Sequence, residues 1–123
     1  MGNVLLAGVG GFVGAALRFA LGGWVSRASL GMVFPWGTFA VNVLGCLAAG
    51  LLMAWASRSG LLTPSIRALL FTGLLGGFTT LSAFGLETIQ LLHRQEVLVA
   101  LLYVIGSIGA ALAAVWIGLA AAR

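Results

Sequence analysis

The strongest constraint on this chain is that nearly all of its length falls into four apolar runs, each about as long as a membrane crossing. A bilayer core about 30 Å thick is spanned by roughly 20 helical residues. Runs of at least that size cover about residues 2–25, 35–56, 63–92 and 97–122. We therefore predict an all-α integral membrane protein, a single four-helix transmembrane domain over residues 1–123, whose short connectors hold no active site.

The composition supports this fold class and disfavours others. Hydrophobic residues make up 62% of the chain and charged residues only 7%, whereas an ordinary soluble domain has about 25% charged residues. Only Glu87 and Glu96 are acidic, so the net charge of +4 reflects a scarcity of acids. Nucleic-acid binding needs clustered Lys and Arg on an exposed face and is not favoured. The single cysteine, Cys46, lies within an apolar run and is interpreted as a packing residue.

The third run is longer than one crossing requires, and its middle reads GLLGGFTTLS over residues 73–82. Because Gly costs about 1 kcal/mol relative to Ala in a helix and hydroxyl groups can bind freed backbone groups, this segment can break a membrane helix near its middle. Gly73 and Gly77 also have the spacing of a close-packing Gly-x-x-x-Gly face in an unbroken helix. The sequence leaves both interpretations open.

The arginines are divided almost evenly between the two sides of such a membrane protein. With four crossings, Arg58, Arg67 and Arg123 share one side. Arg27 and Arg94 lie on the other, with Arg18 near that end of the first helix. Orientation follows the excess of Lys and Arg in cytoplasmic loops, so this chain does not specify which way it inserts. Two interpretations follow: the chain is made in both orientations and pairs with its inverted copy, or it has one weakly specified orientation.

Polar residues within membrane segments are costly, so they are the functional candidates. Thr38 and Asn42 are four residues apart and share a helix face, as do Tyr103 and Ser107. These faces offer hydrogen-bond donors without fixed charge, which suits a small anion that must be bound and released. The alternative is that the same groups only join helices through hydrogen bonds. No Ser-His-Asp set, phosphate-binding loop or metal-ligand cluster occurs in the sequence, so we expect no enzyme.

Three motifs indicate a family. They are GGFVGAALR at residues 10–18, PWGTFAVNVLG at 35–45 and GGFTTLSAF at 76–84, with Glu87 following. In order and spacing they resemble the signature of the Fluc (CrcB) fluoride channel family, and the resemblance covers essentially the whole chain. It implies a fluoride-selective channel that exports cytoplasmic fluoride passively and reduces its toxicity. It also implies an antiparallel, dual-topology homodimer in the bacterial plasma (inner) membrane, with two fluoride pathways.

The resemblance also implies particular site residues. A structural sodium ion is expected at the dimer centre, held by backbone carbonyls at positions that match Gly76 and Thr79. In the first helix, Arg18 is expected to draw anions into a vestibule. The complete set of fluoride-pathway residues implied by the match is Asn42, Phe84, Tyr103, Ser107, Thr38, Leu81, Thr80, Arg18 and Glu87.

This sequence departs from the family pattern at two positions. The family uses two Phe residues in the third helix, whose positively polarised ring edges face fluoride. Phe84 keeps the second of them, but Leu81 stands at the first. Ala111 stands where many relatives carry a second Ser in the fourth helix. Because both changes remove anion contacts, they predict reduced throughput.

Two other functions compete with the channel. A small multidrug-type transporter has a similar size, but it relies on an acidic residue in the first helix, where this chain has none. A non-transporting assembly subunit would use the glycine pairs Gly10/Gly14 and Gly73/Gly77 only for packing. In that case Asn42→Ala would change stability without abolishing any flux.

Overall fold

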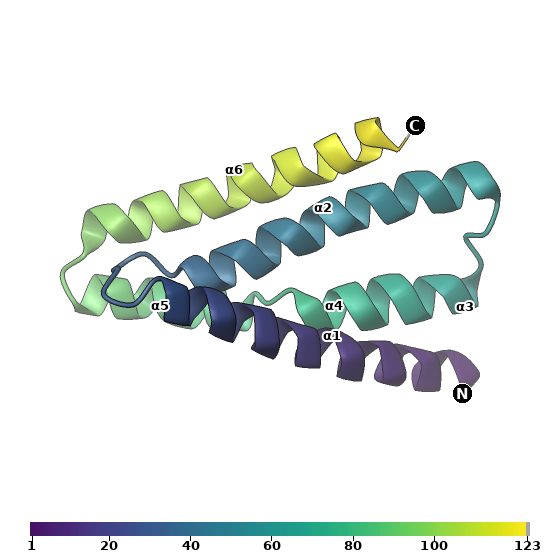
Figure 1. The fold of residues 1–123 in the computed structure, drawn as a ribbon, viewed down its shortest axis with the longest axis horizontal. Helices are drawn as coiled ribbons and strands as arrows, with labels where there is room; N and C mark the ends of the chain where they lie inside the picture. The colour runs from purple at the N-terminus through teal and green to yellow at the C-terminus, as the bar shows by residue number, and fades with distance from the viewer. Residues whose placement is uncertain (123) are drawn as a thin grey trace.

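Four helical crossings run back and forth along the long axis of the protein (Figure 1). This computed structural model describes residues 1–122. Three crossings are single helices: α1 (Gly2–Ala28), α2 (Trp36–Ser59) and α6 (Val97–Ala121). All four are long and apolar enough to cross a bilayer, so the protein is a multi-pass membrane protein.

The third crossing is composite. Thr63 caps its start, because the Thr63 hydroxyl accepts a hydrogen bond of 3.2 Å from the backbone N–H of Ile66, with Pro64 at the first helical position. The pieces in chain order are α3 (Pro64–Ile66), the π-helix η1 (Arg67–Leu75), α4 (Gly76–Phe78) and α5 (Ser82–His93). A non-helical segment of residues 79–81 separates α4 from α5.

The first two helices extend three residues beyond the ends that the sequence predicted. α1 continues to Ala28 because the chain turns only at Gly31, whose φ of 86° lies in the left-handed region. α2 continues to Ser59 and ends at Gly60, which adopts a left-handed φ of 69°. The polar residues at 57–59 therefore extend the helix instead of ending it.

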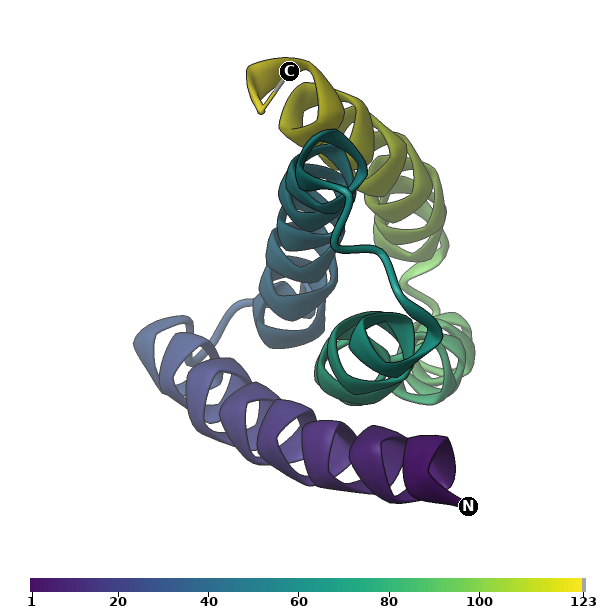
Figure 2. The same ribbon diagram turned by 90° about the vertical axis from the view of Figure 1, so that its right-hand side faces the viewer.

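The crossings pack as two pairs. α2 lies against α6, and α1 lies against η1 and α4, so that α1 and α6 occupy opposite sides of the molecule (Figure 2). Both termini lie at one end of the molecule, as an even number of crossings requires (Figure 1). Arg58 and Arg67 lie toward that end, and Arg27 and Arg94 lie toward the other. The predicted balance of arginines holds for the described residues, and Arg123 lies outside them.

Glycines let the first and third crossings approach backbone to backbone. A Cβ on Gly73 would lie 2.7 Å from the Ala7 carbonyl oxygen, and one on Gly77 would lie 2.6 Å from that of Gly11. Real Cβ atoms do not approach this closely, so these positions exclude any side chain. The close packing expected of Gly73 and Gly77 is therefore confirmed, but the unbroken helix that went with this interpretation is wrong.

The helix break is also confirmed, and it follows the glycines instead of occurring at them. Thr79 adopts an extended backbone with φ of −87° and ψ of 159°, and the helix resumes at Ser82. The two interpretations that the sequence left open thus apply to different residues of the same segment. The glycines pack against α1, and the hydroxyl residues form the break.

Gly14 provides a test of this close packing. We expect Gly14→Ala to lower the free energy of unfolding by about 1–3 kcal/mol through overpacking, because its Cβ would meet Leu74 and would lie 2.9 Å from the Phe78 amide nitrogen. Gly8→Ala on the same helix is the matched control, since a Cβ at Gly8 meets no atom within 4 Å. Thermal unfolding in detergent measures both variants. Equal unfolding temperatures would contradict the packing described here.

Candidate functional site

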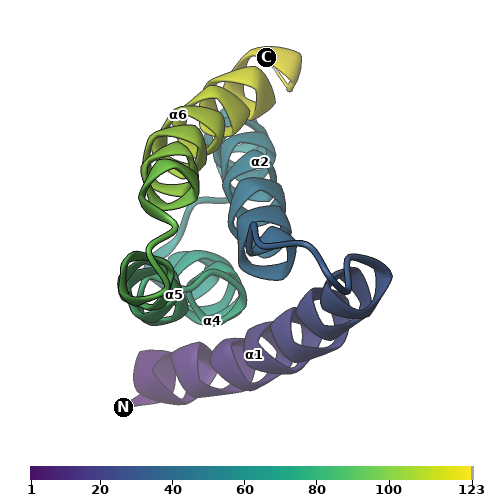
Figure 3. The ribbon, with the colours of Figure 1, turned by 90° about the vertical axis from the view of Figure 1, so that its left-hand side faces the viewer.

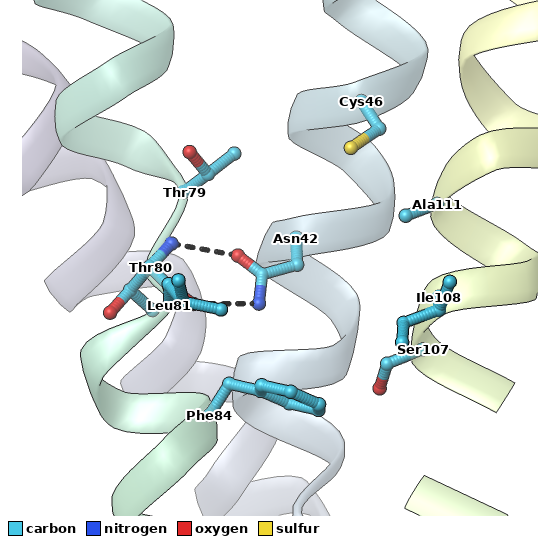
Figure 4. A pocket seen from close by; sticks show the side chains of 9 residues that line it. All are labelled: Asn42, Cys46, Thr79, Thr80, Leu81, Phe84, Ser107, Ile108 and Ala111. Carbon is cyan, nitrogen blue, oxygen red and sulfur yellow. Dashed lines mark hydrogen bonds between the residues drawn. The ribbon is translucent and has the colours of Figure 1, made fainter. Parts of the chain in front are cut away.

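The side chain of Asn42 bridges the break in the third crossing. Its Oδ1 accepts a hydrogen bond of 2.8 Å from the Thr80 backbone N–H, and its Nδ2 donates one of 3.0 Å to the Thr80 carbonyl (Figure 4). The Asn42 amide thus provides hydrogen-bond partners for both the N–H and the carbonyl of Thr80, which lies outside the helices. Backbone groups without partners cost several kcal/mol at membrane depth, so this pair of bonds makes the break tolerable.

Two other side chains form hydrogen bonds with backbone groups at the helix ends on either side of the break. The Thr80 hydroxyl accepts a hydrogen bond of 3.1 Å from the Ala83 N–H and so caps the start of α5. At the end of α4, Nε of Arg18 donates to the Gly77 carbonyl at 3.0 Å. A guanidinium group is favourable there because carbonyl dipoles accumulate at a helix carboxyl end. The predicted residues Arg18, Asn42 and Thr80 therefore all act on the break.

A pocket of about 250 Å³ lies on one side of the Asn42–Thr80 bridge (Figure 4). Its polar wall includes Ser107, which is 8% exposed and whose Oγ has no hydrogen-bond partner among the described residues. A buried hydroxyl of this kind needs a hydrogen-bond partner, which a water molecule or a small ligand can supply. The nine lining residues come from α2, the break, α5 and α6: Asn42, Cys46, Thr79, Thr80, Leu81, Phe84, Ser107, Ile108 and Ala111.

A second pocket, of about 190 Å³, lies between α1, α2 and the break. Thr80 lines both pockets, so the bridged residue separates them. The second pocket combines a guanidinium group with hydroxyl groups and contains no acidic side chain. Its lining residues are Arg18, Phe19, Gly22, Gly23, Ser26, Gly37, Thr38, Val41, Thr80 and Ala83.

The remaining two predicted residues bind each other. Tyr103 is fully buried, and its hydroxyl donates to Oε1 of Glu87 at 3.1 Å. The Tyr103 ring packs against Phe84 with ring centroids 5.0 Å apart, which connects this pair to the first pocket. Glu87 also lines a small polar pocket at the end of the molecule that carries Arg94.

The structure differs from the sequence-based expectations at two places. Thr38 and Asn42 share a helix, but Thr38 lines the second pocket and Asn42 the first. Cys46, interpreted as a packing residue, lines the first pocket. Leu81, a predicted pathway residue, also lines the first pocket and is 80% exposed. The lining role of Cys46 could have been found in the sequence, because Cys46 follows Asn42 by one helical turn.

The geometry defines a class of protein before any comparison. It is a multi-pass membrane protein whose third crossing is broken near its middle and sealed by a side-chain amide. One pocket beside the break has neutral donors, and the other combines hydroxyl groups with the Arg18 guanidinium group. The family described as CrcB-like protein, Camphor Resistance (CrcB), matches residues 5–119. The chain belongs to this family, as its motifs predicted.

Individual relatives are similar over almost their whole lengths. A protein of Methylobacillus flagellatus named fluoride-specific ion channel FluC is 50% identical over 118 residues, which are 96% of this chain and 92% of that protein. A protein of the same name from Rhizobium etli is 45% identical over 98% of this chain and 96% of its own. Another from Geotalea daltonii is 43% identical over 100% of this chain and 98% of its own.

The two hydrogen bonds between Asn42 and Thr80 should contribute to the stability of the fold. In Asn42→Ala both backbone groups of Thr80 lose their partner, and each unsatisfied group costs about 1–3 kcal/mol. We expect a lower free energy of unfolding and faster hydrogen exchange at the Thr80 amide, measured by thermal unfolding in detergent and by exchange detected with NMR.

The matched control is Cys46→Ala, which changes the same pocket one helical turn away without touching the bridge. It should leave exchange at Thr80 unchanged. If Thr80 were equally protected in Asn42→Ala, the amide would not be what seals the break.

Proposed function

We propose that this chain forms a passive, fluoride-selective ion channel that exports cytoplasmic fluoride across the bacterial plasma (inner) membrane and so reduces fluoride toxicity. The observation that carries the proposal is the bridged break near the middle of a membrane crossing, with a pocket of neutral donors on one side and a pocket containing Arg18 on the other. The names of the relatives, each a fluoride-specific ion channel, support the same anion.

The physical requirements of export fit a pore without an energy source. Hydrogen fluoride enters cells as a neutral weak acid, ionises in the more alkaline cytoplasm and is trapped as the anion. A membrane potential that is negative inside favours exit of the anion by about 2.3 kcal/mol per charge for each 100 mV. A selective pathway is therefore sufficient, and neither ATP nor a proton carrier is required.

The first pocket supplies the groups that a dehydrated fluoride ion needs. We assign the pathway to the buried Ser107 hydroxyl, the second N–H of the Asn42 amide and the ring of Phe84, all of which line this pocket. Fluoride would also pass the Tyr103–Glu87 pair, which adjoins Phe84. In the second pocket Arg18, Thr38 and Thr80 would form the vestibule from which anions enter. Neutral donors bind an anion without holding it as a central Lys or Arg would.

An antiparallel homodimer would cover the break. Gly76 is exposed and Leu81 is 80% exposed in the single chain, although irregular backbone at membrane depth persists only where protein or a water-filled cavity covers it. Apart from Arg18, which lies within α1, the described arginines lie two toward each end and favour neither orientation. A second copy inserted in the opposite direction is thus compatible with the chain and would bury the exposed break.

A sodium ion at the dimer centre fits the carbonyls of the break. In an unbroken helix the Gly76 carbonyl would accept from the Thr80 N–H and the Thr79 carbonyl from the Ala83 N–H. Both donors are engaged elsewhere, by Asn42 Oδ1 and the Thr80 hydroxyl respectively. Gly76 and Thr79 would hold the ion through these carbonyls, since oxygen ligands suit a hard cation. Bound sodium would stabilise the interface and would not be transported.

The function is tested by flux from liposomes. Purified protein is reconstituted in liposomes loaded with potassium fluoride, valinomycin is added, and efflux is followed with a fluoride electrode beside chloride-loaded vesicles. We expect rapid fluoride release and no chloride release. Asn42→Ala should abolish fluoride release, with Cys46→Ala as the control for pocket volume. Folded dimers that release nothing would contradict the channel and would favour a non-transporting assembly subunit.

Leu81 is tested in the same assay. If its missing ring edge slows conduction, Leu81→Phe should raise the fluoride flux severalfold, because it restores a positively polarised ring edge at the first pocket. Leu81→Met, which has no aromatic ring, is the matched control. Equal rates for the wild type and Leu81→Phe would eliminate the hypothesis of reduced throughput.

A further inference from the structure

The connector between α1 and α2 places an aromatic ring against Tyr103. The ring centroids of Phe34 and Tyr103 are 5.3 Å apart with an interplanar angle of 84°, an edge-to-face pair. Tyr103 also contacts Phe84, with centroids 5.0 Å apart. The only tyrosine of the chain, fully buried, is therefore in contact with a ring that lines the first pocket and with a ring that comes from a connector.

The backbone around Phe34 forms a tight turn. Pro35 has φ of −77° and ψ of 76°, and the Trp36 N–H donates to the Phe34 carbonyl at 2.9 Å. These values define an inverse γ-turn, which the proline ring favours because it fixes φ. The Phe34 ring also packs on Trp36 and Phe39, with centroid distances of 4.4 and 5.5 Å. Backbone and side-chain packing together fix the position of this ring.

The two residues that flank Phe34 in the connector line a small pocket that Phe34 does not line. Val33 and Pro35 line a pocket of about 110 Å³ together with Glu87, Gln90 and Arg94. Val33 and Pro35 thus share a pocket with Glu87, while Phe34 between them packs on the Tyr103 ring. In Figure 3 the α1–α2 connector faces the viewer at the same end of the molecule as the α5–α6 connector. Through Phe34 it contacts the ring of Tyr103, whose hydroxyl donates to Glu87.

We propose that Phe34 is a positioning residue for conduction: its ring holds Tyr103 so that the phenol stays bonded to Glu87 and its ring stays against Phe84. The inference rests on the proposed function, because it concerns the rate at which fluoride passes Tyr103. The physical reason is that the direction of a phenol O–H follows from the position of its ring, and edge-to-face packing fixes that position. Neither Phe34 nor its turn touches the first pocket, so the effect acts through Tyr103.

The experiment combines a flux assay with a spectroscopic probe of Tyr103. Because the chain contains one tyrosine, ring-labelled ¹³C-tyrosine gives a signal from Tyr103 alone. Phe34→Leu removes the ring, Phe34→Trp keeps an aromatic ring, and Met32→Ala changes an exposed residue of the same connector. If Phe34→Leu does not yield folded protein, Phe34→Met replaces it, since Met fills irregular space without a ring.

We expect Phe34→Leu to reduce fluoride flux by roughly two- to tenfold, the range of an aromatic pair, and to shift and broaden the Tyr103 ring signal. Phe34→Trp should recover most of the flux, and Met32→Ala should change neither readout. In a Tyr103→Leu background, Phe34→Leu should have little further effect on flux. A sub-additive result of this kind supports action through Tyr103.

Two results overturn the inference separately from the proposed function. Wild-type flux in Phe34→Leu, with a conducting wild type, shows that the ring is not needed for conduction. An unchanged Tyr103 signal with reduced flux shows that Phe34 acts by another route. A wild type that conducts no fluoride overturns the proposed function itself, and this inference with it.

Discussion

The structure depends on one constraint, that every backbone polar group within a membrane needs a partner. The crossings formed by α1, α2 and α6 meet this constraint through unbroken helices. The third crossing is broken, and there the Asn42 side chain binds both backbone groups of Thr80. The Thr80 hydroxyl and Arg18 serve the adjoining helix ends. The break therefore acts as the organising centre of the fold, because α1, α2 and the two halves of the third crossing all meet there.

This arrangement explains why the candidate site lies where it does. A broken helix leaves polar groups near the middle of a membrane crossing, where an intact helix presents only side chains. The side chain that seals the break also lines the first pocket, while Thr80 lines both pockets. Stability and function consequently share residues, and the flux of Asn42 variants has to be interpreted beside their stability. Ser107 is different, because its buried hydroxyl has no partner among the described residues and so is available to a ligand.

Close glycine packing and the break are complementary. Gly73 and Gly77 bring the third crossing against α1 backbone to backbone, and that proximity allows Arg18 of α1 to reach the Gly77 carbonyl at 3.0 Å. A larger residue at these positions would separate the helices and remove the guanidinium group from the helix end. The exposed Gly76 and Leu81 then mark the face of the break that the single chain leaves uncovered.

The sequence by itself determined the fold class, the four crossings, the cap at Thr63 and the family, because hydropathy, capping chemistry and motif spacing are local properties of the chain. It also indicated both the glycine face and the break, but it could not assign them to separate residues. Only the tertiary structure decided that Asn42 binds Thr80, that Thr38 faces a different pocket from Asn42, and that Phe34 packs on Tyr103. These contacts join residues distant in sequence, so they depend on how the helices pack and no local pattern encodes them.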